Sequence, residues 1–437
     1  MDEDALSIVD AVESDTMLVS WDVGRRCNYD CTYCPAHRHD NVSPHASMAE
    51  LQDSAKFVFE YLSIMMPYKA KKRVSISFTG GEPTANPNFI AFGKWLRDEH
   101  NAKYKDLYYL NLSLTTNGAM GKKMCDSLIQ NYQFSTISYH CEAKPKTKQQ
   151  AINNMLYLHK AGFGVKVNVM FHAQEDYFEE CKQLCLLLAE HGVDFVPRMI
   201  GEYNDNNRYH HRYSPEQLQW MKDFWDNHKK TLAKPVPKAM APEQFHEDEK
   251  EETPEGKIAQ RAEVKVIVPA KEESCSGPGE AKESKGNARD LGRPCCGKRA
   301  LNVCSSSTGQ WQKTSFLTFT KFEDWFCTVN WFFLHIEQQT GEIFHHQTCK
   351  ANFGKKREAI GNLSNTAAIT DQLRKNIEAK TMPVIVCPNK ICGCGLCLPK
   401  AGKLEDFKSI IPRHIDMEIF KNNPLISDSA GLASSEA

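Results

Sequence analysis

The sequence lacks the long apolar runs of a membrane protein. No stretch of about 18 apolar residues occurs, and the acidic start Met1-Asp-Glu-Asp has neither the basic region nor the apolar core of a signal peptide. Charge of one sign is also missing, since 54 Lys and Arg offset 55 Asp and Glu to a formal net charge of -1. These absences exclude a bulk electrostatic attraction to nucleic acid or to an anionic membrane. We therefore expect a cytoplasmic protein that recognises its partners through local sites.

The sequence also lacks an internal repeat, and residues 234–292 lack nearly all aromatic side chains. That segment is rich in Lys, Glu, Pro, Ala, Gly and Ser, which is typical of a linker or a mobile insertion. The 437 residues allow about two to three domains. We expect an N-terminal segment at 1–16, a first domain at 17–232, a linker or mobile insertion at 233–292, a second domain at 293–415 and a C-terminal tail at 416–437.

Short β-rich runs alternate with amphipathic helical patterns between residues 17 and 200. The strands are predicted at 17–24, 73–79, 110–116, 134–140, 164–171 and 194–200, and a further helix at 213–231. Ser47 and Glu50 form a capping-box pattern, and Gly162 and Gly192 stand where helices end. Strict alternation implies a parallel sheet with right-handed crossovers. We expect an α/β fold, a partial (β/α)6 TIM-like barrel, whose functional residues lie at the carboxyl ends of the strands.

Cysteine, in contrast, is abundant: the chain has 17, in a sequence far too long for a small disulfide scaffold. In a reducing compartment, cysteines bunched along the chain favour metal binding over disulfides. Three of the 17, Cys125, Cys181 and Cys185, lie on helical patterns and are expected in the core.

Cys27, Cys31 and Cys34 lie directly after the first predicted strand. An iron–sulfur cube has four irons, so three thiolates from one loop leave one iron open if no fourth cysteine is near. An open coordination position is typical of a catalytic metal centre. The alternative is a zinc site in which His37 or His39 supplies the fourth ligand.

The second predicted strand is followed by Thr79-Gly80-Gly81-Glu82-Pro83. Two glycines allow the backbone to approach a ligand closely, and Glu82 can accept hydrogen bonds from an amine. Together with the cysteine spacing, Tyr33 ahead of the last cysteine and six β/α units, this turn resembles the radical S-adenosylmethionine (SAM) superfamily over roughly residues 17–200.

The resemblance implies that Cys27, Cys31 and Cys34 ligate three irons of a [4Fe-4S] cluster, and that SAM chelates the fourth through its amino and carboxylate groups. It implies that Tyr33 lies near the adenine of SAM and that Gly80, Gly81 and Glu82 hold the methionyl amine. The other SAM contacts that it implies are Asn117, Ser138, Asn168 and Arg198. A buried Asn or Arg is as often a satisfied structural group.

Residues at the barrel top are candidates for proton or hydrogen transfer. These are His140, Cys141, Glu142 and Glu202. His140 stands where the family frequently has an aspartate, and this departure puts a carboxylate role at that position in doubt.

A second group of cysteines lies toward the C-terminus. Cys327 and Cys349 flank an apolar pattern that predicts a β-hairpin turning at Gly341. With Cys387, Cys392, Cys394 and Cys397, they resemble the SPASM or twitch extension of radical SAM enzymes, which makes the second domain a small cysteine-rich α+β unit. The extension implies one auxiliary [4Fe-4S] cluster, or two if Cys295, Cys296 or Cys304 contributes. Gly341 departs from the family's spacing, which leaves the cluster count open. A zinc ribbon is the alternative.

The resemblance implies an enzyme that reductively cleaves SAM and uses the 5′-deoxyadenosyl radical to take hydrogen from a peptide, a protein or a small molecule. It also implies an electron donor such as flavodoxin or ferredoxin, and auxiliary clusters that relay electrons or hold substrate. Residues 1–16 are too few for the winged-helix peptide-recognition module often fused there. A separately encoded module would restore a peptide role. The alternative enzyme is a small-molecule dehydrogenase or epimerase, acting on a sugar, nucleotide or antibiotic precursor.

A non-enzymatic electron-transfer or metal-scaffold protein would explain the cysteines. It would not explain Gly80-Gly81-Glu82-Pro83 at the end of a neighbouring strand.

Overall fold

The structure is a computed structural model that describes residues 8–10, 16–34, 39–200, 213–231, 301–304, 311–314, 322–345, 359–387 and 398–427. All of these residues fall in one compact unit. Its centre is a nine-stranded sheet in the order β13-β12-β11-β2-β3-β4-β5-β6-β7. The strands are β2 (Met17–Asp22), β3 (Arg73–Thr79), β4 (Tyr109–Thr116), β5 (Phe134–His140), β6 (Gly164–Phe171), β7 (Asp194–Met199), β11 (Phe333–Glu337), β12 (Glu342–Phe344) and β13 (Gly361–Asn362).

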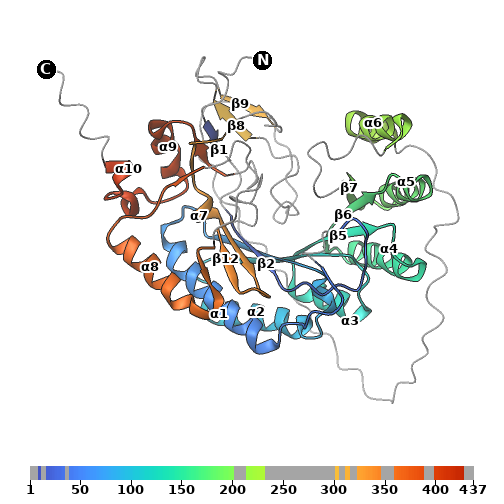
Figure 1. The fold of residues 1–437 in the computed structure, drawn as a ribbon, viewed down its shortest axis with the longest axis horizontal. Coiled ribbons are helices and arrows are strands. Elements are labelled where there is room, and N and C mark those ends of the chain that lie inside the picture. The colour runs from blue at the N-terminus through green and yellow to red at the C-terminus, as the bar shows by residue number, and fades with distance from the viewer. Residues whose placement is uncertain are drawn as a thin grey trace. The chain divides into compact units, whose positions relative to one another are not determined.

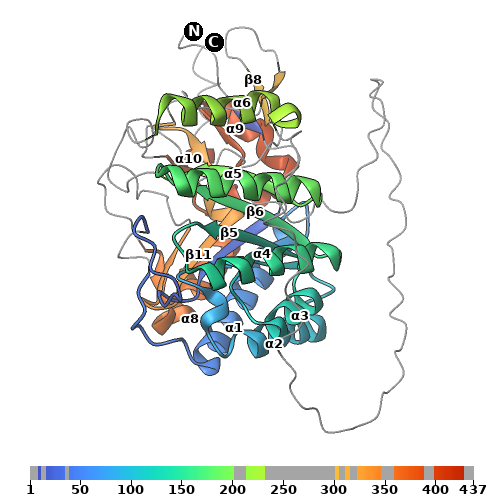
Figure 2. The same ribbon diagram turned by 90° about the vertical axis from the view of Figure 1, so that its right-hand side faces the viewer.

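Helices alternate with β2 to β7 along the chain, as a partial (β/α)6 barrel requires. They are α1 (Met48–Met65), α2 (Phe89–Lys103), α3 (Lys122–Asn131), α4 (Pro145–Lys160), α5 (Glu175–Glu190) and α6 (Pro215–Thr231). Neighbouring strands from β2 to β7 pair in parallel. Helices α1 to α5 cover one side of the sheet, here called its outer face (Figures 1 and 2). The predicted fold class is confirmed.

The six predicted barrel strands coincide with β2 to β7 within one residue at each end, except that β2 ends at Asp22 rather than at residue 24. The chain turns at Gly24, which has a φ of 148°. The capping box of Ser47 and Glu50 is present at the start of α1. Gly162 and Gly192 follow α4 and α5 with φ of 77° and 69°, so both occupy the left-handed conformation that ends a helix.

The two faces of the sheet differ in polarity. Paired residues of neighbouring parallel strands point to the same side, and successive residues alternate. By this register, the outer face carries apolar side chains such as Val19, Trp21, Ile76, Phe78, Leu112, Ile137 and Val167. The ring centroid of Trp21 lies 5.6 Å from those of Phe78 on β3 and Phe92 on α2. The core therefore lies between the sheet and α2.

The inner face carries polar side chains, many of them buried. They are Ser75, Asn111, Ser113, Thr136, Lys166 and His335, on five different strands. A sheet face with this many buried hydroxyl and amide groups is not an ordinary apolar core. The barrel therefore offers hydrogen-bonding groups along its inside.

The predicted hairpin is confirmed, since β11 and β12 pair antiparallel and Gly341 has a φ of 72°. What the sequence did not predict is that β11 also pairs in parallel with β2, which adds a strand to the barrel sheet. The chain beyond the barrel helices thus contributes to the main sheet.

A second sheet has the order β14-β10-β15-β1-β8-β9. Its strands are β1 (Ile8–Asp10), β8 (Leu301–Cys304), β9 (Trp311–Thr314), β10 (Phe326–Cys327), β14 (Ile385–Val386) and β15 (Lys400–Ala401). The remaining helices are α7 (Val329–Phe332), α8 (Thr366–Glu378), α9 (Leu404–Ile410) and α10 (Pro424–Ser427), with short 3₁₀ turns at Met66–Tyr68, Pro83–Ala85, Leu363–Asn365, Ile411–Arg413 and Met417–Phe420. A segment near the N-terminus therefore shares a sheet with the C-terminal part of the chain. The five-part division of the chain stays a prediction.

Candidate iron–sulfur and SAM site

The cysteine trio lies in a tight loop after β2. The backbone N–H of Tyr29 donates to Sγ of Cys27 over 3.4 Å, and the N–H of Cys34 donates to the carbonyl of Cys31 over 3.1 Å. Burial, with smaller contributions from nearby carboxylates and thiols, raises the pKa of the Cys27 thiol to about 11 and that of the Cys31 thiol to about 12. Without a cation, these thiols stay protonated. Positively charged irons would lower their pKa values and favour the thiolates that bind metal.

The Gly80-Gly81-Glu82 turn is packed against the backbone at the start of the cysteine loop. Gly81 N–H donates to the carbonyl of Gly24 over 2.8 Å, and Glu82 N–H donates to that of Arg26 over 2.9 Å. A Cβ on Gly81 would clash with the carbonyl oxygens of Arg25 and Arg26. The glycine at 81 is therefore required by the cysteine loop itself, a role that the sequence did not predict.

Glu82 joins the ends of β3 and β4. Its side chain is 3% exposed and accepts hydrogen bonds from the backbone and hydroxyl of Thr84, from Thr116 Oγ1 over 2.7 Å and from the N–H of Asn117 over 2.6 Å. Burial raises the pKa of this carboxyl although all these groups donate to it. Glu82 thus fixes the strand ends beside the cysteine loop, and its binding of an amine stays a prediction.

Asn117 links β4 to the cysteine loop. Its Nδ2 donates to Oδ1 of Asn28 over 2.6 Å, and its Oδ1 accepts from the N–H of Ala119 over 3.0 Å. The residue is 5% exposed. The loop is therefore held at residue 28 by the same asparagine that Glu82 positions.

Tyr33 and His140 form an aromatic pair beside the trio. Their rings stack with centroids 5.9 Å apart, and Tyr33 Oη lies 2.6 Å from His140 Nδ1. Burial lowers the pKa of His140 to about 4, so its imidazole is neutral at neutral pH, and burial raises the pKa of Tyr33. Aromatic rings beside the cysteine trio can stack against a nucleobase.

Glu142 lies beyond β5 and also contacts the cysteine loop. Its two carboxylate oxygens accept from the backbone N–H of Thr32 over 2.8 Å and from the Thr32 hydroxyl over 2.7 Å. His172 Nε2 lies 3.9 Å from Oε1 of Glu142. The loop segment between Cys31 and Cys34 is thereby attached to the carboxyl ends of β5 and β6.

Cys141 points away from this site. It is fully buried, and its Sγ and that of Cys181 both lie near the carbonyl of Met170, at 3.7 and 3.4 Å. Cys125, Cys181 and Cys185 are buried as well, as predicted. Glu202 lies outside the described residues. Transfer roles for His140, Cys141 and Glu142 stay predictions.

Ser138 and Asn168 lie opposite each other on β5 and β6, on the inner face. Oδ1 of Asn168 is buried without a hydrogen-bond partner. Buried acceptors are seldom unpaired, so a donor from a ligand would complete this site. Arg198 is exposed and pairs in register with Met170 of β6, which places it on the same face. The three residues are therefore available to a ligand at this face.

The residues present fit a cluster bound through three thiolates. The donor set is three thiols of one loop, and that loop is fixed by contacts from three neighbouring strand ends. Within the part of the chain that the structure describes, no three His, Cys, Asp or Glu side chains are gathered around one point as a single ion requires. A cluster that offers a separate iron to each thiolate does not need such convergence. Of the two histidines considered for a zinc site, His37 lies outside the described residues. The Nε2 atom of His39 lies 3.7 Å from Oδ1 of Asp30.

The predicted auxiliary ligands are described in part. Cys327 ends β10 and Cys387 follows β14, the neighbouring strand, and Cys387 N–H donates to the carbonyl of Trp325 over 2.8 Å. Cys304 ends β8, which is separated from β10 by β15 and β1, a spacing of roughly 14 Å at about 4.8 Å per strand. Six predicted ligands lie outside the described residues: Cys295, Cys296, Cys349, Cys392, Cys394 and Cys397. A cluster that includes Cys327 and Cys387 would thus be distinct from one that includes Cys304.

Sequence reasoning missed several residues that hold the site together. They are Asn28, Thr32, Thr84 and Thr116. Thr84 carried a readable signal, because the side chain that caps a helical turn commonly accepts from the backbone N–H two residues later, and Glu82 precedes a turn that starts with Pro83. The contacts of Asn28 and Thr32 arise between segments about a hundred residues apart and have no local signal.

A family model described as the radical SAM superfamily matches residues 21–188, which is less than half of the chain. The match begins at the end of β2 and reaches into α5, so it contains the cysteine loop and the Gly80-Gly81-Glu82 turn. No curated protein matches the chain.

Several solved structures are similar to part of this chain. One is anSMEcpe with bound AdoMet, 15% identical with a TM-score of 0.34, covering 48% of this chain and 62% of that chain. Another is anSMEcpe with bound AdoMet and the Cp18Cys peptide, 16% identical with a TM-score of 0.35, covering 48% and 61%. A 5-methylcytosine deaminase from Klebsiella pneumoniae is 11% identical with a TM-score of 0.24, covering 34% and 36%. This chain thus spans less than two thirds of each, and the fold assignment rests on the strands and helices themselves.

None of the helices in the described ranges is both long enough and apolar enough to cross a bilayer.

Proposed function

We propose that this protein is a radical SAM enzyme. Cys27, Cys31 and Cys34 would bind a [4Fe-4S] cluster, with SAM beside it. When bound, the cluster and SAM supply reductive cleavage of SAM to methionine and a 5′-deoxyadenosyl radical, which takes hydrogen from the substrate. The observation that carries the proposal is the cysteine loop, which is held by the Gly80-Gly81-Glu82 turn, by Asn117 and by Glu142 within the segment that the radical SAM family model matches.

The surroundings of the loop support binding of SAM there. The neutral Tyr33–His140 pair would accept the adenine. The unpaired oxygen of Asn168, next to Ser138, would accept a hydrogen bond from a ribose hydroxyl. These residues bind and orient the cofactor, and the barrel supplies the walls that exclude water.

The inner face supports a polar substrate. Ser75, Asn111, Ser113 and Thr136 line the sheet behind the candidate SAM site, and hydroxyl and amide groups can bond to amides or sugars alike. We therefore propose a peptide, protein or polar small molecule as the substrate. Electrons would come from a carrier such as flavodoxin or ferredoxin.

We also propose that the C-terminal cysteines hold at least one auxiliary cluster. The support is the placement of Cys327 and Cys387 on neighbouring segments of one small sheet. Such a cluster would relay electrons or hold the substrate.

The test of the main proposal is anaerobic reconstitution with iron and sulfide, followed by dithionite and SAM. We expect 5′-deoxyadenosine from the wild type and none from Cys31→Ala. Cys185→Ala is the matched control, because it removes a buried thiol of α5 that has no place in the site. If wild-type protein with a full [4Fe-4S] complement forms no 5′-deoxyadenosine, the proposal is wrong.

A further inference from the structure

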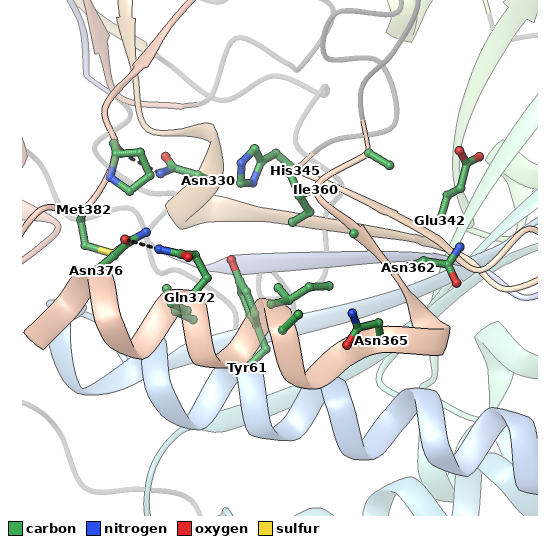
Figure 3. Close-up of a pocket in the computed structure, with 16 residues that line it drawn as sticks. Tyr61, Asn330, Glu342, His345, Ile360, Asn362, Asn365, Gln372, Asn376 and Met382 are labelled. Atoms are coloured by element: carbon green, nitrogen blue, oxygen red, sulfur yellow. Dashed lines mark hydrogen bonds between the residues drawn. The ribbon is translucent and has the colours of Figure 1, made fainter.

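A cavity of about 740 Å³ lies between α1, α8 and the β12–β13 end of the main sheet (Figure 3). Its lining includes Tyr61 of α1, Ile369 and Gln372 of α8, and Asn362 of β13. It contains none of the residues of the candidate cluster site. Its volume is in the range of pockets that bind small molecules.

The cavity has a buried floor and an exposed rim. Tyr61, Asn330 and Met382 are 3–4% exposed. Asn365, in the turn before α8, and Gln372, on α8, are exposed. Solvent, and therefore a ligand, can reach the cavity from the side of α8.

Asn330, which lines this cavity, has an unused acceptor. Its Nδ2 donates to the carbonyl of Pro383 over 2.9 Å, and this bond fixes which end of the amide is the oxygen. The remaining Oδ1 is buried and has no hydrogen-bond partner. Because buried polar atoms are nearly always paired, this oxygen calls for an N–H or O–H group from a bound molecule.

A second hydrogen-bonding element lies on α8. Gln372 Nε2 donates to Asn376 Oδ1 over 2.8 Å. That bond uses neither the Gln372 oxygen nor the Asn376 amide nitrogen, so an acceptor and a donor stand next to each other on the cavity wall (Figure 3). Paired donor and acceptor groups of this kind recognise the edge of a nucleobase.

The charge of the lining disfavours anionic ligands. Among the lining residues that the structure describes, none is Lys or Arg, His345 is the one basic side chain, and Glu342 contributes a carboxylate. A phosphate or carboxylate would therefore find no permanently charged cation to pair with. The apolar lining consists of Ile360, Ile369, Leu373, Met382 and Pro383, and such side chains pack against the faces of a planar ring.

We propose that this cavity binds an uncharged nucleoside, with the base packed on the apolar side chains and its polar edge bonded to the carboxamides. Asn330 accepts a hydrogen from the ligand, and Gln372 with Asn376 bonds the base edge. This site is separate from the candidate SAM site and does not depend on the proposed radical chemistry.

The test is isothermal titration calorimetry of the full chain with adenosine, guanosine and uridine, and with the monophosphate of each and ribose as comparison ligands. We expect at least one nucleoside to bind, and its monophosphate and ribose to bind at least about tenfold more weakly, because the described lining has no Lys or Arg and the base makes the contacts. If no nucleoside binds, or if ribose binds as tightly as the nucleosides, the proposal is overturned.

Two tryptophan variants locate the binding. Ala368 lines the cavity and is exposed, so Ala368→Trp fills the cavity without burying a new side chain in the core. Ala367→Trp is the matched control, since Ala367 is an exposed neighbour on α8 outside the lining. We expect nucleoside affinity to fall at least about tenfold in Ala368→Trp and to stay unchanged in Ala367→Trp. Equal affinity in the two variants, as binding at the SAM site would give, overturns the proposal.

A rim variant serves as a second test. Gln372 is exposed, so Gln372→Leu should fold normally and lose one hydrogen bond to the base, with roughly a tenfold loss of affinity. Unchanged affinity in Gln372→Leu would contradict the role given to α8.

Discussion

Cys27, Cys31 and Cys34 come from one loop, whereas Cys327 and Cys387 lie on two segments of a sheet that also contains residues 8–10 and 400–401. In the first region, backbone hydrogen bonds from the turn after β3 and side-chain hydrogen bonds from residues after β4 and β5 hold a loop whose cysteine spacing is already set by the sequence. In the second region, the cysteines are positioned by strand pairing between distant parts of the chain.

This difference bears on how each region tolerates change. A loop held by a few contacts loses its arrangement when one contact is blocked, while the surrounding barrel keeps its core. Cysteines placed by a sheet keep their positions as long as the strands pair. Substitutions near the trio should therefore act on metal binding before stability.

Among variants that keep every cysteine, the largest effect should come from Gly81→Ala. The added Cβ would clash with the backbone of Arg25 and Arg26, which no side-chain rotation can relieve. Overpacking of this kind costs about 1–3 kcal/mol, which corresponds to a loss of up to roughly a hundredfold in cluster binding and SAM cleavage. The measurement is iron content and 5′-deoxyadenosine after reconstitution.

Gly121→Ala is the control for that variant, because Gly121 has nothing within 4 Å of an added Cβ and no positive φ. Equal iron content in the two glycine variants would show that contact with the turn does not position the cysteine loop.

The next effect separates the two cysteine regions directly. We expect Cys327→Ser and Cys387→Ser each to lower iron content after reconstitution while 5′-deoxyadenosine formation stays near the wild-type rate, because these cysteines would serve an auxiliary cluster. Cys31→Ala, in contrast, should abolish SAM cleavage. The measurements are iron quantification and product chromatography. Loss of SAM cleavage in both serine variants would mean that the second sheet supports the barrel site itself.

Glu142→Gln should have a smaller effect. The amide can bond only one of the two donors of Thr32 through its single carbonyl oxygen, and the charge that strengthens both bonds is lost. A hydrogen bond to a charged group contributes about 1.5–3 kcal/mol, of which a part is kept, so we expect roughly a tenfold slower SAM cleavage with unchanged unfolding temperature. Glu179→Gln, on α5 away from the loop, is the control. A lowered unfolding temperature with unchanged cleavage would reduce Glu142 to a structural role.

The barrel was predictable because its signals are local. The alternation of strands and helices, the Ser47–Glu50 box and the glycines at 162 and 192 each lie within one element or its end. The pairing of Ile8 with Ala401 and of Phe333 with Leu18 joins segments hundreds of residues apart, and no local pattern specifies it. For the same reason the cysteine spacing predicted the candidate site, but the contact of Glu142 with Thr32 appeared only in three dimensions.

Ser47→Ala should have the smallest effect. It tests whether α1 couples the cysteine loop to the C-terminal part of the chain. The N-terminus of α1 follows the cysteine loop, and Tyr61 and Glu60 near its other end reach the cavity and Arg374 of α8. Loss of the capping box costs about 1 kcal/mol, so the unfolding temperature should fall by a few degrees while SAM cleavage is unchanged. The loop is held from the ends of β3, β4 and β5 rather than from α1. Loss of the capping box should therefore leave the geometry of the cysteine loop unchanged. A parallel fall in SAM cleavage would mean that α1 transmits strain to the loop, and the contrast between a locally held site and a sheet-held one would then be wrong.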